Sequence, residues 1–275
     1  MANKSQFSFF KMVASGNDFI VIDNRKNIVQ DPAALAREAC ARHTGVGADG
    51  VLLFENSRKA DFKMRIINAD GSEAEACGNG FRCIALFAKE KLGYPSDCTF
   101  ETQAGMIQST IRGRAIRVRL PNPKDFREDE EIEVTQHRLH YYFINTGVPH
   151  VVIFVEGLLK INVPELGRAI RWHSRFQPKG TNVNFAEIKA KNEIHVRTYE
   201  RGVENETQAC GTGVTASALT SSLAGYTVSP VRVKTRGGEI LTVDFKQNGK
   251  KITDVFLQGG TRFVFEGKLL LDSKT

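Results

Sequence analysis

The sequence Ala76-Cys77-Gly78-Asn79-Gly80 recurs in nearly the same form as Ala209-Cys210-Gly211-Thr212-Gly213. In both copies a cysteine is followed by a Gly-x-Gly turn and then by a run of small and apolar residues typical of a helix. The start of a helix presents backbone N–H groups without helical partners and the positive end of the helix dipole. We therefore expect Cys77 and Cys210 to have a pKa below that of an ordinary thiol and to form a pair of acid–base groups facing one substrate.

The two copies belong to a longer duplication of the sequence. Arg65 lies 12 residues before Cys77, and Arg197 lies 13 residues before Cys210. In both copies a glycine follows the cysteine after 28 residues. A shared order with near-constant spacing indicates a duplicated unit, and two copies are too few for a solenoid. The sequence therefore predicts two similar domains with one cysteine each and a cleft between them.

Each copy is predicted to be a sheet wrapped around a buried helix. The helix that follows Gly80 is apolar on nearly all sides, which is typical of a helix without a solvent-facing side. The second helix, from Val214 to Ala224, is rich in Ala, Ser, Thr and Leu. Because short alternating strands precede and follow both helices, we expect an α+β fold of two pseudo-symmetric domains, each with a mixed or antiparallel β-sheet around its central helix.

The domain boundaries are predicted from composition and length. At 275 residues the chain has the length of two domains, and Pro121-Asn122-Pro123 is the best boundary between them. The tail, residues 261–271, is predicted to form one more strand pair. Because the other copy has no counterpart of this tail, we expect it to return to the first domain. The expected domains are residues 1–122 with 261–275, and residues 123–260.

Charge and hydropathy exclude several classes of protein. The formal net charge is +7, from 38 basic and 31 acidic residues, but these charges are scattered and no nucleic-acid-binding motif is present. No apolar run approaches the roughly 20 residues that a membrane span needs, and residues 1–10 lack the features of a secretory signal. We therefore expect a cytoplasmic protein that binds neither nucleic acid nor membrane.

The cysteine pattern and the glycine pattern argue against a disulfide framework and against bound groups. There are five cysteines, an odd number, and none of them forms a C-x-x-C pair. Residues 45–50 match G-x-G-x-x-G, but they follow a predicted helix and precede a strand, which is the reverse of a dinucleotide-binding motif. The sequence therefore predicts no metal ion and no dinucleotide.

Five motifs form a set that is specific when all are taken together. They are Gly16-Asn17-Asp18-Phe19, Asn68-Ala69-Asp70-Gly71, Cys77 to Cys83, Tyr199-Glu200-Arg201-Gly202 and Glu206 to Gly213. In this order, and over nearly the whole chain, they resemble the diaminopimelate epimerase family. The resemblance implies epimerisation of LL-2,6-diaminoheptanedioate to the meso form, in lysine and peptidoglycan precursor biosynthesis. It implies a small amino-acid substrate and no pyridoxal phosphate or other cofactor, and a homodimer is compatible with it.

The chemistry of such an epimerisation fits the two cysteines. Inverting a stereocentre by proton transfer requires a base on one face of the carbon and an acid on the other, each within hydrogen-bond reach of the transferred proton. A thiolate and a thiol can exchange these roles when the reaction runs backwards. One thiol must start ionised and the other neutral, so the two pKa values should be coupled. We predict that Cys77 and Cys210 are this pair, and which face each serves stays open.

The helix starts are also predicted to bind the substrate. Backbone N–H groups of Gly78 and Asn79, and of Gly211 and Thr212, can hold the reacting carboxylate and stabilise the charge that builds up as the proton leaves. The alternative is that Asn79 and Thr212 are simple turn or cap residues.

Further site residues follow from the resemblance alone. It implies that three asparagines hydrogen-bond the substrate and that Glu200 and Arg201 bind its far end. Arg201 suits a carboxylate through its two-pronged guanidinium, and Glu200 suits an ammonium group. His150 and Glu200 match positions that tune the cysteine thiols. The three asparagines are Asn17, Asn68 and Asn182.

One position departs from the family pattern. The family often has Gly-Asn-Pro-His where this chain has Gly147-Val148-Pro149-His150. Since a valine side chain neither donates nor accepts a hydrogen bond, any substrate contact of that asparagine is lost or is made by another group.

Two other interpretations remain open at this point. The first is another cofactor-independent racemase, such as a relative of proline racemase, whose substrate has no second amino-acid end. The second is a binding protein of the same fold, or a redox sensor that uses the two thiols. A substrate panel separates the first from an epimerase, and deuterium exchange at the α-carbon separates the second.

Overall fold

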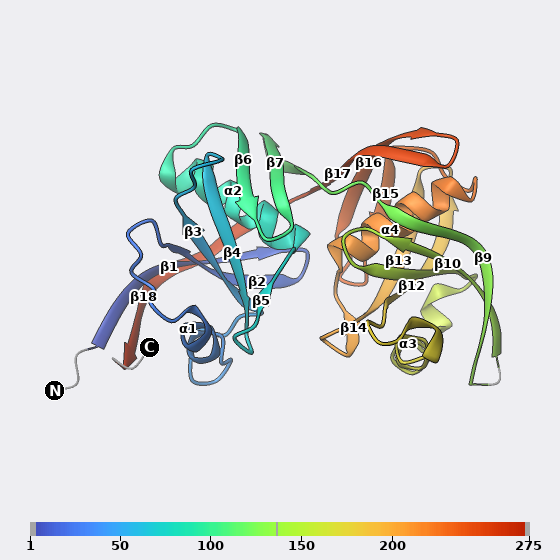
Figure 1. Ribbon diagram of the computed structural model, residues 1–275, viewed down its shortest axis with the longest axis horizontal. Coiled ribbons are helices and arrows are strands. Elements are labelled where there is room, and N and C mark those ends of the chain that lie inside the picture. Colours follow the sequence, from blue (N-terminus) through green and yellow to red (C-terminus); the bar gives the residue numbers. More distant parts are fainter. Residues whose placement is uncertain (1–3, 136, 273–275) are drawn as a thin grey trace. The chain divides into compact units, whose positions relative to one another are not determined.

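The computed structural model describes residues 4–135 and 137–272, and the chain divides into two compact units (Figure 1). Unit 1 comprises Met1–Val118 with Gly259–Thr275, and unit 2 comprises Arg119–Gln258. No helix in the described ranges is long and apolar enough to cross a membrane.

Unit 1 is a mixed sheet in the order β18-β1-β2-β3-β4-β6-β7-β8, with short β5 also paired to β4. The pairs β2–β3 and β4–β6 are parallel and the others are antiparallel. Its elements are β1 (Lys4–Ala14), β2 (Asn17–Asp23), α1 (Pro32–Ala39), β3 (Gly50–Glu55), β4 (Phe62–Asn68), β5 (Glu73–Ala74), α2 (Gly78–Leu92), β6 (Asp97–Thr102), β7 (Gly105–Arg112), β8 (Ala115–Arg119) and β18 (Arg262–Asp272).

Unit 2 has the same arrangement, in the order β9-β10-β11-β12-β13-β15-β16-β17, with short β14 also paired to β13. The parallel pairs are β11–β12 and β13–β15, at the same two places as in unit 1. Its elements are β9 (Lys124–Val134), β10 (His137–Asn145), β11 (Pro149–Phe154), the 3-10 helix η1 (Leu158–Lys160), α3 (Val163–Arg171), the 3-10 helix η2 (Ser174–Phe176), β12 (Asn182–Ala190), β13 (Glu193–Glu200), β14 (Asn205–Thr207), α4 (Gly211–Leu223), β15 (Val231–Lys234), β16 (Ile240–Asn248) and β17 (Lys251–Gly259).

Each sheet curls around one helix, so the predicted α+β class with mixed sheets is confirmed. Helix α2 packs against β1, β2, β3 and β7, and α4 packs against β10 to β13 and against β15 and β16 (Figure 1). Aromatic rings fill the space between α2 and its sheet. Phe62 stacks on Phe100 with ring centres 4.9 Å apart, and Phe81 meets Phe100 edge-on at 5.8 Å.

Helix α4 is buried although its sequence is rich in hydroxyl groups. Thr215 Oγ1 donates to the Gly211 carbonyl at 2.9 Å, and Ser217 Oγ donates to the Gly213 carbonyl at 2.8 Å. These bonds within the helix satisfy the hydroxyls of Thr215 and Ser217, so both side chains can be buried without losing a hydrogen bond, whereas the buried Thr220 hydroxyl has no partner among the described residues. The small size of these side chains lets the surrounding strands approach the helix closely.

The prediction for the C-terminal tail was wrong in two respects. Residues 262–272 form the single long strand β18 and not a strand pair. Gly267, in the middle of this strand, lies opposite Phe9 in the ladder, where a Cβ would sit 3.2 Å from the Phe9 ring. The tail also has a counterpart, because β9 borders β10 in unit 2 as β18 borders β1 in unit 1.

Candidate active site

Cys77 is the residue immediately before helix α2. Its backbone is extended, with φ −150° and ψ 108°, and its Sγ accepts a hydrogen bond from the Gly80 N–H at 3.5 Å. The side chain is half-buried, whereas Gly78 and Asn79 of the first turn are buried. The sulfur therefore lies at the positive end of a helix dipole, where a thiolate is favoured.

Cys210 occupies the equivalent position before helix α4. Its backbone is again extended, with φ −115° and ψ 111°, and its Sγ lies 3.4 Å from Thr212 Oγ1. Thr146, which follows β10, donates its hydroxyl to the Thr212 carbonyl at 3.2 Å and so fixes this helix start to the neighbouring strand. Cys210 is only 6% exposed.

A matching arginine–glutamate pair leads into each cysteine. In unit 1, Arg65 of β4 donates Nε and Nη2 to the two carboxylate oxygens of Glu73 in β5, at 2.9 and 2.7 Å. In unit 2, Arg197 of β13 makes the same two bonds to Glu206 in β14, at 2.6 and 2.8 Å. Each pair joins a sheet strand to the short strand just before the cysteine. The recurring arginines were visible in the sequence, but their glutamate partners were not identified there.

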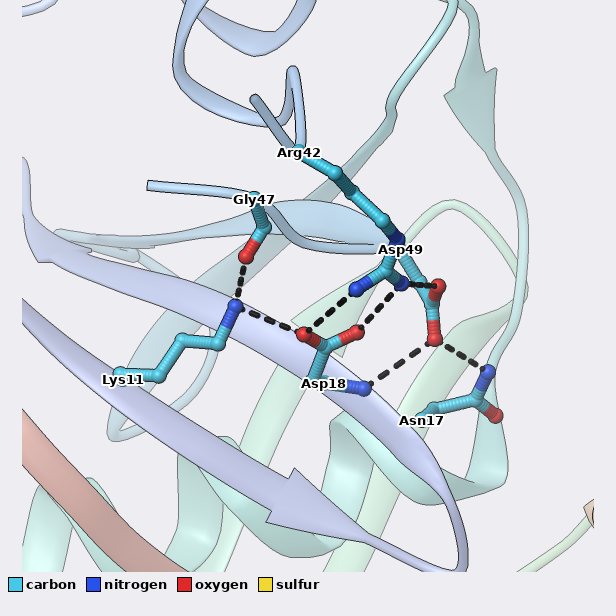
Figure 2. A network of polar contacts seen from close by, with 6 residues as sticks. All are labelled: Lys11, Asn17, Asp18, Arg42, Gly47 and Asp49. Carbon is cyan, nitrogen blue, oxygen red and sulfur yellow. Dashed lines mark hydrogen bonds and ion pairs between the residues drawn. The ribbon is translucent and has the colours of Figure 1, made fainter. Parts of the chain in front are cut away.

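Asn17, at the start of β2, has its amide held from both sides, and Figure 2 shows the side formed by Asp49. Its Nδ2 donates to Asp49 Oδ2 at 2.9 Å. On the other side, its Oδ1 accepts from Asn79 Nδ2 at 2.5 Å. Asn79 Oδ1 in turn accepts from Nη2 of the buried Arg82 at 2.9 Å. These bonds fix the orientation of Asn17 and connect it directly to the first turn of α2, beside Cys77.

Charged side chains support Asn17 from the other side (Figure 2). Arg42 Nη2 bonds Asp49 Oδ1 at 2.7 Å and Asp18 Oδ1 at 3.1 Å, and the buried Lys11 pairs with Asp18 at 2.7 Å. Burial by itself would raise the pKa of Asp18, but the hydrogen bonds from Lys11 and Arg42 outweigh it and hold that pKa below its usual value. Two carboxylates and two cations therefore form a balanced network.

The loop that matches G-x-G-x-x-G contributes to this network. Its Gly47 carbonyl accepts from Lys11, and its Asp49 holds Asn17. At Gly45 a Cβ would lie 2.3 Å from the Glu38 carbonyl oxygen, so this glycine is required for close packing on α1. Gly45 thus has a structural explanation, as does Gly50, where a Cβ would lie 2.7 Å from the Ile67 carbonyl oxygen.

Loss of the Asp49 carboxylate is expected to weaken substrate binding. Asp49→Ala removes the acceptor that orients Asn17, and a hydrogen bond of about 1 kcal/mol corresponds to a rise in KM of about fivefold. Steady-state kinetics measures this. Asp23→Ala, which breaks the Asp23–Arg25 pair at the other end of β2, serves as the matched control with unchanged KM. Equal KM values in the two variants would contradict a role of Asp49 in holding Asn17.

Asn68, the last residue of β4, lies at the same end of the strands as Asn17. The ladder places Phe19 of β2 beside Gly50 of β3, and Gly50 beside Asn68 of β4. Asn68 Nδ2 donates to Ser72 Oγ at 3.0 Å within the turn that follows β4. Unit 1 therefore brings Asn17, Asn68 and Asn79 to one end of three neighbouring strands and to one helix start.

Unit 2 brings His150, Asn182 and the Glu200–Arg201 turn together in the same way. Strand β11 places His150 beside Asn182, and β13 places Tyr199 beside Val183, so Glu200 ends its strand next to Asn182. Asn182 Oδ1 accepts the Arg201 backbone N–H at 2.8 Å, and its Nδ2 donates to the Pro149 carbonyl at 3.5 Å.

His150 is fully enclosed within unit 2. It is 0% exposed, and its Nδ1 lies 3.1 Å from Asn184 Nδ2. Burial, together with the positive charge of Arg201, lowers the pKa of His150 to about 3. The imidazole is therefore neutral at physiological pH. Among the described residues, no three or more His, Cys, Asp or Glu side chains are arranged to hold a metal ion.

Comparison with known sequences connects these features to a family. The sequence model of the family described as "Diaminopimelate epimerase" matches residues 9–122 and 142–264. A diaminopimelate epimerase of Aquifex aeolicus (strain VF5) is 47% identical over 274 residues, covering 95% of this chain and 97% of that protein. One of Archaeoglobus fulgidus is 38% identical, covering 97% of this chain and 98% of that protein.

Comparison with solved structures supports the fold. A hydroxyproline epimerase from Agrobacterium vitis, with bound trans-4-hydroxy-L-proline, superposes with a TM-score of 0.75 at 15% identity, covering 100% of this chain and 95% of that one. A PhzF-family phenazine biosynthesis protein of Bacillus anthracis superposes with a TM-score of 0.76 at 17% identity, covering 97% of this chain and 99% of that one. At such low identity these structures show a shared fold.

Proposed function

Because this chain belongs to the diaminopimelate epimerase family and is an isomerase of that family, we propose that it converts LL-2,6-diaminoheptanedioate to the meso form by proton transfer between two cysteines. The observation that carries the proposal is the duplication. Two units with the same strand order each hold one cysteine at the start of the helix that their sheet surrounds.

The proposed reaction uses one cysteine as a thiolate and the other as a neutral thiol. The thiolate of one cysteine removes the α-proton, forming an S–H bond and leaving a carbanion next to the carboxylate. The thiol of the other cysteine gives its proton to the opposite face of that carbon and becomes the thiolate. The two sulfurs have then exchanged protonation states, the stereocentre is inverted, and no proton is gained or lost overall.

Helix starts supply the electrostatic stabilisation in this proposal. The first-turn N–H groups of Gly78 and Asn79, and those of Gly211 and Thr212, carry the positive ends of the α2 and α4 dipoles. As the proton leaves, negative charge moves onto the α-carboxylate, and donors aimed at that charge lower the barrier. The same dipoles favour the thiolate forms of the cysteines, which His150 and Glu200 would tune further.

The far end of the substrate distinguishes this reaction from that of a simple amino-acid racemase. We assign the distal carboxylate to Arg201 and the distal ammonium to Glu200, with Asn17, Asn68 and Asn182 as further hydrogen-bond partners. The bond between Asn182 and the Arg201 backbone N–H supports this assignment, because it fixes the base of the Arg201 side chain. We place the reaction in the cytoplasm, where thiols stay reduced, within lysine and peptidoglycan precursor biosynthesis.

Arg201→Gln is expected to impair binding more than chemistry. Loss of a charge-assisted hydrogen-bond pair worth about 1.5–3 kcal/mol should raise KM by about 10- to 100-fold, with a smaller change in kcat. The backbone N–H of residue 201 can still donate to Asn182 Oδ1 in this variant, because that bond does not involve the side chain of residue 201. Steady-state kinetics on this variant and on Arg138→Gln, which alters an exposed arginine of the same unit, provides the comparison. A normal KM in Arg201→Gln would remove Arg201 from the binding site.

A substrate panel tests the proposed function. The purified protein, with no added cofactor, is incubated with LL-2,6-diaminoheptanedioate, with proline and with hydroxyproline, and the stereoisomers are separated by chiral chromatography. The meso form from the LL substrate, with no change in the other two, is the expected result. Racemisation of proline alone would establish a proline racemase, and no turnover of any substrate would favour a binding or redox role.

A further inference from the structure

A second asparagine of β12, two residues after the ladder partner Asn182, contacts both the ring of His150 and the start of helix α4. Asn184 of β12 is fully buried, and its Nδ2 lies 2.9 Å from the Val151 carbonyl oxygen and 3.1 Å from His150 Nδ1. Its Oδ1 accepts the hydroxyl proton of Thr198, on β13, at 2.9 Å. The motifs considered in the sequence included neither Asn184 nor Thr198.

These bonds determine where the proton of His150 is. A backbone carbonyl can only accept, so the Asn184 atom facing Val151 is the amide nitrogen, and the Thr198 hydroxyl on the other side bonds the amide oxygen. The second N–H of that nitrogen points to His150 Nδ1, which must therefore accept it with a lone pair. Since the buried ring is neutral, its proton resides on Nε2.

The Nε2 atom has no hydrogen-bond partner among the described residues and is buried. A buried donor without a partner is costly, typically by about 1–3 kcal/mol, and such atoms in native proteins call for a specific explanation. An N–H donor held in this way stabilises an anion, whereas the other tautomer would present a lone pair and repel it.

We propose that Asn184 is a positioning residue, braced by Thr198, which locks His150 as a neutral Nε2–H donor toward an anion of the reaction. The anionic groups of the proposed reaction are a cysteine thiolate and the substrate carboxylates, so this role rests on the proposed function. In this arrangement His150 lowers the energy of the anion without adding a positive charge, and it does not act as a base.

Gly213 provides a second link between Asn184 and the site. A Cβ at Gly213 would lie 2.3 Å from Asn184 Oδ1 and 3.2 Å from Thr198 Oγ1. The second glycine of the Cys210-Gly-x-Gly motif is therefore the point where the helix start rests on the asparagine. Asn184 thus contacts both the ring of His150 and the helix that begins at Cys210.

The tautomer is measured directly by 15N NMR of the whole protein labelled at histidine, with the His150 signals identified by their loss in His150→Gln. The wild-type protein is expected to show a protonated Nε2 and an unprotonated Nδ1. Asn184→Asp places an acceptor-only carboxylate against Nδ1 and is expected to move the proton there. A wild-type Nδ1 that carries a proton would overturn the proposal before any variant is made.

Kinetics then tests whether the tautomer matters. In a serine protease triad, the wrong histidine tautomer lowers kcat by about 10⁴-fold. We therefore expect the kcat of Asn184→Asp to be at least about tenfold below that of the wild-type protein, with little change in KM. Thr198→Val keeps the shape of the side chain but removes its hydrogen bond to Asn184 Oδ1, so kcat should fall by less than in Asn184→Asp. Thr198→Ser keeps a hydroxyl donor and should have the wild-type kcat. A normal kcat in a folded Asn184→Asp protein with the altered tautomer would exclude the positioning role.

The two proposals can fail separately. The NMR measurement needs no substrate, so the tautomer is established or refuted even if the protein does not act on LL-2,6-diaminoheptanedioate. Should Asn184→Asp not fold, the wild-type spectrum and the pair Thr198→Val and Thr198→Ser still decide the question.

Discussion

Replacing Cys77 or Cys210 by serine is expected to reduce kcat by a factor of about 10²–10⁴, the contribution of a positioned acid or base. A serine hydroxyl has nearly the size of a thiol but does not ionise near neutral pH, so it cannot replace the thiolate. Substrate binding should persist, because the backbone N–H groups of the helix start remain. Chiral chromatography measures turnover, and titration calorimetry measures the dissociation constant.

A third cysteine provides the control for this experiment. Cys98 is buried in unit 1, and its Sγ bonds the Pro95 carbonyl at 2.9 Å, a bond that a serine hydroxyl can also make. Cys98→Ser is therefore expected to keep full activity. Retention of wild-type turnover in either Cys77→Ser or Cys210→Ser would refute the two-base assignment.

Arg197→Leu is expected to lower the free energy of unfolding of unit 2 by about 3–5 kcal/mol. The side chains of Arg197 and Glu206 are 9% and 11% exposed. Removing Arg197 leaves the buried Glu206 carboxylate with only the half-exposed Arg236, 3.7 Å away, as a cationic partner. Arg197 Nη1 also donates to the carbonyls of Leu158 and Ile161, at 3.0 and 2.9 Å, and these acceptors lose their donor as well.

The equivalent pair in unit 1 is the matched control. The side chains of Arg65 and Glu73 are 28% and 25% exposed, so water can solvate the Glu73 carboxylate that remains. Arg65→Leu should therefore lower the free energy of unfolding by about 1 kcal/mol or less. Denaturant unfolding followed by fluorescence reports on unit 2, because the single tryptophan of the chain, Trp172, lies there. The denaturant midpoint measured by Trp172 fluorescence should fall in Arg197→Leu and remain unchanged in Arg65→Leu. Equal shifts of the midpoint in the two variants would contradict this account.

The duplication made much of the fold predictable from the sequence. The Cys-Gly-x-Gly repeats mark the starts of α2 and α4 because the signals are local: a cap, small residues and then an apolar run. The end of α2 is equally local, with Gly93 in the left-handed region at φ 76°. By contrast, residues 261–271 were predicted as two strands, because the continuity of β18 depends on its pairing with β1, far away in the sequence.

The parts of the candidate site that were missed depend on strand register. Asn184 contacts His150 because β11 and β12 run in parallel with His150 beside Asn182, and no local pattern specifies that register. Asp49 reaches Asn17 because the parallel strands β2 and β3 place their starts side by side, although β2 and α1 separate the two residues in the sequence. The recurrence of Arg65 and Arg197 before the cysteines indicated that they matter, but only the paired short strands reveal their glutamate partners.

The most direct test of the central claim is epimerisation of the LL substrate in heavy water with no added cofactor. If two sulfurs work from opposite faces, the first meso product carries one solvent deuterium at the inverted α-carbon and none at the other. Substrate recovered early should still hold its original proton, because the sulfur that removed this proton returns it. Meso product that keeps the original proton, or deuterium that enters recovered substrate as fast as product, would contradict a mechanism with two separate cysteine acids and bases.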